Sequence, residues 1–85
     1  MKKYLVACNL GGNVIRSYIV EMIDGYRPSS DNMLKLKKAV VKGHKPRSYH
    51  SYAAPPECGG YMGTTTGDEI KPENLPILAV SNLEL

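Results

Sequence analysis

The chain has 85 residues, which suffices for one small domain and excludes a second. Its 42% hydrophobic and 22% charged residues exclude an intrinsically disordered chain, and no window approaches the ~20 apolar residues of a membrane span. The net charge of +3 conceals a split, because residues 32–56 carry six Lys and Arg without an acid, whereas residues 57–85 carry five acids and one Lys. This split predicts either a cationic binding surface or two parts that lie side by side in the fold, and we prefer the second interpretation.

The first predicted element is a β-hairpin. Residues 3–10 and 14–23 are rich in strand-forming side chains, and Gly12-Asn13 between them suits a two-residue turn. With that turn, the face predicted to be buried contains the pairs Leu10–Ile15, Cys8–Ser17 and Val6–Ile19. The face predicted to contact water pairs Asn9 with Arg16 and Ala7 with Tyr18.

A helix over residues 14–23 is the alternative, because apolar residues also recur there at helical spacing. The β-branched side chains of this segment lose rotamer freedom in a helix, and the G-x-G-x-x-G pattern of a nucleotide-binding unit is absent. The hairpin is therefore preferred.

A helix is predicted from about residue 32 to residue 42. Residues 29–31, Ser-Ser-Asp, offer N-cap oxygens, and Gly43 is predicted to end the helix. Met33, Leu36 and Val40 form its apolar stripe. Lys37 projects near the middle of that stripe. We expect its aliphatic stem to pack against the apolar stripe while its ammonium group reaches water.

The last predicted element is a strand over residues 76–83. It is apolar on both faces, which favours a central position in the sheet. The predicted core contains Val6, Ile15, Ile19, Leu36, Val40, Leu78 and Val80.

These elements predict an α+β fold, in which a small antiparallel sheet of the N-terminal hairpin and the C-terminal strand carries one helix on one face. The segments KKYLVACNLGGNVIRSYIVEM, SSDNMLKLKKAV and LPILAVSNLEL together resemble the small ββαβ proteins of unknown function that phages and prophages encode. The resemblance leaves residues 43–74 as a loop-rich insertion in the single domain. It implies an accessory protein that binds a protein partner, and it implies no catalytic residue.

The insertion interleaves cations with flat side chains. This pattern suits a protein interface and equally suits phosphate contacts with base stacking, so a nucleic-acid-binding module using residues 35–52 is the second hypothesis. The alternation over residues 47–52 also permits a plain strand, one of whose Tyr rows completes the core. The predicted binding residues are Lys42, Lys45, Arg47, Tyr49, His50 and Tyr52.

A third hypothesis is a metal site or a thiol-dependent enzyme. His44, His50 and Cys58, with Cys8 as a fourth, are possible zinc ligands, and Cys58 with His50 is a possible nucleophile pair. Their spacing fits none of the compact zinc-binding patterns, and two residue types do not define a catalytic geometry. A non-enzymatic protein without metal or cofactor is therefore preferred.

Two cysteines do not make a disulfide framework, so the expected compartment is the reducing cytoplasm. The edges of so small a sheet favour a homodimer. Its predicted interface is a row of exposed side chains on the second strand: Arg16, Tyr18 and Val20.

Overall fold

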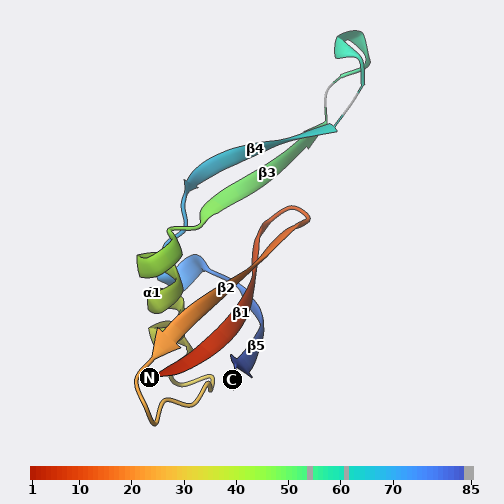
Figure 1. Ribbon diagram of the computed structural model, residues 1–85. Helices are drawn as coiled ribbons and strands as arrows, with labels where there is room; N and C mark the ends of the chain where they lie inside the picture. The colour runs from red at the N-terminus through yellow and green to blue at the C-terminus, as the bar shows by residue number, and fades with distance from the viewer. Residues whose placement is uncertain (54, 61, 84–85) are drawn as a thin grey trace.

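A computed structural model describes residues 1–53, 55–60 and 62–83 (Figure 1). Strands β1 (Lys2–Gly11), β2 (Val14–Met22) and β5 (Ile77–Leu83) form an antiparallel sheet in the order β2-β1-β5. Helix α1 (Met33–His44) packs on one face of that sheet, and β3 (Arg47–Ala53) and β4 (Met62–Glu69) form a separate antiparallel pair. Two 3-10 turns, η1 (Pro56–Cys58) and η2 (Pro72–Asn74), complete the chain. The predicted α+β fold is confirmed.

The N-terminal hairpin has the predicted turn but not the predicted register. Gly11 pairs with Val14 across Gly12-Asn13, and the register then shifts by one residue before Asn9 pairs with Ile15. The Asn9 side chain holds this shift, because its Oδ1 accepts a hydrogen bond of 2.8 Å from the Gly11 amide. Gly11 has a φ of +116°, which side-chain-bearing residues rarely adopt.

The shift exchanges the two faces of β2. Val6 pairs with Tyr18 rather than with Ile19, so Val20 and Met22 join the core. The prediction that Ile15 and Ile19 are buried is wrong, since both lie on the opposite face with 53% of their surface exposed. Ile15 to Ile23 does not form a helix.

Helix α1 begins one residue later and ends two residues later than predicted. Its N-cap is Asn32, whose side chain makes no capping bond and instead accepts a hydrogen bond of 2.8 Å from the Ser29 amide. Gly43 does not end the helix, because the left-handed turn falls at Lys45. This residue has a φ of 47°, and its amide donates a hydrogen bond of 2.9 Å to the Val41 carbonyl. Lys37 is half-buried, which agrees with a packed aliphatic stem.

Strand β5 lies at an edge of the sheet, and the prediction of a central position is wrong. The central strand is β1, which pairs with β2 on one side and with β5 on the other. Leu78 is consequently exposed and Val80 only half-buried, although both were expected in the core.

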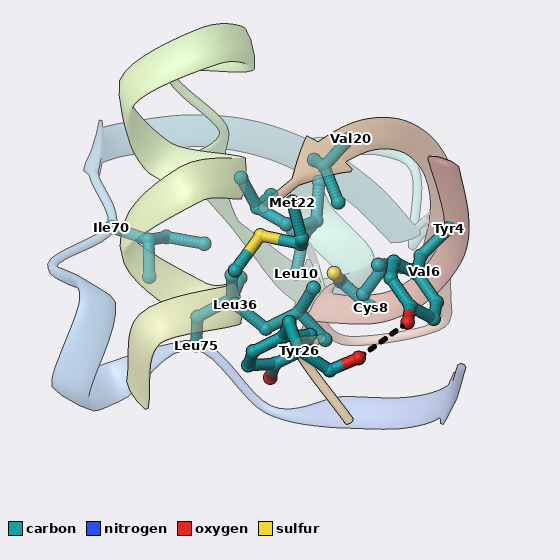
Figure 2. Packing of buried hydrophobic residues seen from close by; sticks show 11 residues of the cluster. Tyr4, Val6, Cys8, Leu10, Val20, Met22, Tyr26, Leu36, Ile70 and Leu75 are labelled. Atoms are coloured by element: carbon teal, nitrogen blue, oxygen red, sulfur yellow. Dashed lines mark hydrogen bonds between the residues drawn. The ribbon is translucent and has the colours of Figure 1, made fainter. Parts of the chain in front are cut away.

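Among the described residues, eleven buried side chains from the sheet, the helix and the segments between them form the core (Figure 2). Leu36 and Val40 of α1 and Val6 of β1 are completely buried, as predicted. Tyr4 donates a hydrogen bond of 2.9 Å from its hydroxyl group to the Tyr26 carbonyl, and the two rings meet edge to face. The full set is Tyr4, Val6, Cys8, Leu10, Val20, Met22, Tyr26, Leu36, Val40, Ile70 and Leu75.

The β3–β4 pair extends away from the sheet and α1, so the chain is elongated (Figure 1). Its extents are 57 × 24 × 20 Å and its radius of gyration is 15.8 Å, against ~12 Å for a compact chain of this length. We call residues 47–69, which comprise β3, η1 and β4, the arm. The segment predicted as a loop-rich insertion therefore contains a second hairpin.

Candidate binding arm

Both ends of the arm are anchored in the folded body. The left-handed turn at Lys45 leads from α1 into β3, and Pro46 is buried. The Ile70 amide donates a hydrogen bond of 2.9 Å to the Pro46 carbonyl, which closes the arm at its base. Ile70 and Leu75 then enter the core, so the arm cannot move as a free loop at this end.

The two faces of the arm differ in their surroundings. Tyr49 lies on the face toward the body and packs against the core cluster. Its backbone closely approaches Gly11, where a methyl group would overlap the Tyr49 carbonyl oxygen. Tyr49 therefore joins the arm to the tip of the β1–β2 hairpin, as expected if one Tyr row completes the core.

The other face carries Tyr52 and His50 above two glycines of β4. Tyr52 pairs with Gly63, and its ring covers the position that a Gly63 side chain would occupy. His50 Nε2 lies 3.0 Å from the corresponding position of Gly67 and 3.4 Å from Ser48 Oγ. Aromatic side chains stabilise strand glycines in this way, which explains how a glycine-rich segment forms a strand.

The six predicted binding residues do not form one cluster. Lys42 lies on α1, Lys45 at the turn, and Tyr49 faces the body, whereas His50 and Tyr52 share the outer face. Arg47 is tied to the neighbouring strand, since its Nε donates a hydrogen bond of 2.9 Å to the Gly67 carbonyl. Only His50 and Tyr52 are thus brought together as a candidate contact surface.

The predicted interface row on β2 is not exposed as expected. Val20 is buried in the core and Tyr18 is half-buried, so of the three residues only Arg16 is exposed. The centroids of the Tyr18 and His44 rings lie 4.7 Å apart, and His44 Nε2–H donates a hydrogen bond of 2.9 Å to the Ile19 carbonyl. The end of α1 therefore covers part of the row of side chains that was predicted to contact a partner.

The basic and acidic parts of the chain lie side by side, as preferred, because β3 of the basic part pairs with β4 of the acidic part and Arg47 lies opposite Glu69. Among the described residues, however, no ion pair joins the two parts. The two ion pairs of the described residues join the N-terminal amine to Asp24 at 3.4 Å and Lys3 to Glu21 at 3.9 Å. The exposed side of α1 instead presents Lys35, Lys38 and Lys42 without an acidic residue in the helix. We call these three residues the lysine row.

The possible metal ligands are spread over the molecule. His44 contacts β2, His50 lies on the arm, and Cys8 is buried in the core; the side chain of Cys58 lies outside the described part of the chain. Among the residues that the structure describes, no three His, Cys, Asp or Glu side chains gather into a metal-binding group. Those same residues include no helix long and apolar enough to cross a membrane.

Cys8 has the environment of a structural thiol. Burial raises the pKa of this thiol above its ordinary 9.0, so it stays protonated and weakly nucleophilic at neutral pH. Burial likewise raises the pKa of the Tyr26 hydroxyl, and the neighbouring Tyr4 adds to this shift.

These shifts predict slow thiol chemistry and a loss of stability in alkali. A Cys58→Ser variant, which retains Cys8, is expected to react with Ellman's reagent only when urea unfolds it. Because the folded pKa of Cys8 is raised, its contribution to stability is complete below pH 9.0 and is lost as the pH rises through the folded pKa. Urea unfolding at neutral and alkaline pH measures this decline. Rapid modification of the folded protein at neutral pH would contradict the buried position of Cys8.

No known family model, curated protein or solved structure matches the chain.

Proposed function

We propose that the chain is a non-enzymatic interaction protein that binds a protein partner through the outer face of its arm. The observation that carries this proposal is the extension of the arm away from the core, which leaves Tyr52 45% exposed at its outer half. An isolated two-stranded ribbon is marginally stable in water. Binding a partner would stabilise the arm, and Tyr is among the residues enriched at protein interfaces.

The side chains of the outer face suit recognition by hydrogen bonds and aromatic contact. Tyr52 offers a flat ring with a hydroxyl group, His50 offers two ring nitrogens, and Thr65 pairs with His50 across the strands. The acids of the arm, Glu57, Asp68 and Glu69, outnumber its one Arg. This balance favours a protein over a nucleic acid as the ligand of the arm.

The lysine row supports nucleic-acid binding as a second candidate function. This row, Lys35, Lys38 and Lys42, is exposed on one side of α1, and the helix contains no acidic residue that could pair with it. Such a row of lysines can neutralise phosphates. This candidate uses α1 rather than the arm, so the two functions predict different sensitive residues.

Photo-crosslinking in the producing cells distinguishes the candidates. Benzoylphenylalanine at position 52 is expected to give an adduct with a different protein, whereas at Ile15, which has similar exposure on the body, it is expected to give none. Adducts at position 15 alone, or at neither position, would contradict the proposal. Salt-sensitive retention on a mixed DNA and RNA column that Lys38→Glu with Lys42→Glu abolishes would favour the second candidate.

The biological setting is part of the same proposal. The element order β1-β2-α1-β5, interrupted by the arm, supports assignment to the small ββαβ accessory proteins of phages and prophages. The free buried thiol of Cys8 supports a place in the reducing cytoplasm.

A further inference from the structure

Strand β4 carries a segment that reads identically in both directions. Residues 63–67 are Gly-Thr-Thr-Thr-Gly, and the three threonines are exposed. In the described sheets β4 pairs with β3 alone, so its other edge is open (Figure 1). Lys and Pro, which commonly protect open edges from pairing, are absent from Met62–Glu69.

A palindromic edge strand is complementary to itself in the antiparallel direction. If two copies of β4 pair about a two-fold axis through Thr65, each Gly63 faces Gly67 of the second copy and each Thr64 faces Thr66. A symmetric dimer needs this kind of self-complementary surface, and Thr–Thr pairs across strands are favourable. Asp68 of each copy then faces Met62 of the other, which keeps the acidic ends of the two strands apart.

We propose that a second copy of this chain pairs with the open edge of β4, so that the two arms form one four-stranded antiparallel sheet. This goes beyond the proposed function, although it uses the same arm. Three or more strands are needed for a stable sheet, and the pairing supplies the strands that each arm lacks.

The glycines give this pairing a specific contact. The Tyr52 ring extends over Gly63, while His50 Nε2 lies 3.0 Å from the side-chain position of Gly67. Side-chain positions that face each other across strands are ~4.5–5.5 Å apart. Because Gly63 faces Gly67 of the second copy, the Tyr52 hydroxyl of one copy meets the His50 imidazole of the other, twice in the dimer.

The contact between copies gives a second reason why positions 63 and 67 are glycine. Within one chain, Tyr52 and His50 need the space above these glycines. Between copies, a side chain at Gly63 or Gly67 would separate the phenol from the imidazole. The outer faces of the two arms then form one continuous surface with two Tyr52–His50 pairs.

Sedimentation equilibrium tests the pairing directly. The interface is short, so a weak dimer is expected, with the mass rising from 9.3 kDa toward twice that value, 18.6 kDa, as the concentration approaches ~1 mM. Thr65→Lys places two like charges at the two-fold axis and is expected to keep the mass at 9.3 kDa. Ser17→Lys, also at an exposed strand position but on the open face of the β2-β1-β5 sheet, is expected to dimerise like the wild type.

Opposite charges at position 65 test whether the two-fold axis passes through Thr65. Thr65→Lys and Thr65→Glu are each expected to be monomeric with the wild-type circular dichroism spectrum, whereas their equimolar mixture is expected to regain 18.6 kDa. A mixture that stays at 9.3 kDa, a wild type that stays at 9.3 kDa up to ~1 mM, or a dimer that Ser17→Lys abolishes would each overturn the inference.

The crosslinking experiment separates this inference from the proposed function. A monomeric wild type that still gives a Tyr52 adduct with a different protein would overturn the dimer alone. A dimer whose only Tyr52 adduct is with another copy would support the dimer and overturn the proposed partner.

Discussion

Replacing Leu36 by Ala is expected to lower the free energy of unfolding by ~3 kcal/mol. Leu36 is completely buried in the first turn of α1, where it belongs to the core formed with β1, β2 and the segment after the arm (Figure 2). The substitution removes apolar contacts and leaves a cavity that the surrounding strands cannot fill completely. A domain of this size has a total stability of only ~5 kcal/mol, so the variant should lose most of its resistance to urea.

Leu34→Ala is the matched control for this prediction. It makes the same chemical change two residues away on the same helix, at a side chain that is 45% exposed. The expected loss is below ~1 kcal/mol, because little apolar surface is buried there. Urea unfolding of both variants, followed by circular dichroism, gives the comparison. Equal losses would show that α1 packs through a face other than Leu36 and Val40.

The hairpin shows how far sequence patterns determine such a core. The strands and the turn at Gly12-Asn13 were predictable, because β-branched residues flank a dipeptide that accepts positive φ. The register shift at Asn9 to Gly11 was not, because it depends on a side-chain hydrogen bond and on the approach of Tyr49 from a distant strand. One residue of shift sufficed to move Ile15 and Ile19 from the predicted core to the surface.

The predictions for β5 and β4 went wrong for a related reason. The apolar run of β5 indicates a strand but not its neighbours, and the chain places it at an edge. Strand β4 was missed because Gly and Thr there resemble a turn, whereas the Tyr52 ring over Gly63 stabilises it from across the pair. The available signal was the symmetric run of threonines between two glycines. Composition did indicate the arm as the unusual region, although it placed Tyr49 and Tyr52 in one binding set.

The contact between Gly11 of the body and Tyr49 of the arm leads to a second substitution with a large expected effect. Gly11→Ala is expected to destabilise the protein by ~3 kcal/mol, because two costs add at this position. A φ of +116° is unfavourable for Ala, and the new methyl group would overlap the Tyr49 carbonyl oxygen. To relieve that overlap, β3 must move away from the tip of the β1–β2 hairpin, which also withdraws the Tyr49 side chain from the core.

Gly25→Ala isolates the backbone cost. Gly25 has a φ of +88°, but no atom lies within 4 Å of the position of the added methyl group. The expected loss is therefore ~1 kcal/mol from strain alone. Urea unfolding measures both losses of stability. Limited proteolysis within the arm tests whether the contact between Gly11 and β3 is kept, since only Gly11→Ala is expected to accelerate cleavage there. Equal stability losses and equal cleavage rates would mean that β3 does not rest on Gly11, and the arm would then be held only at Pro46 and Ile70.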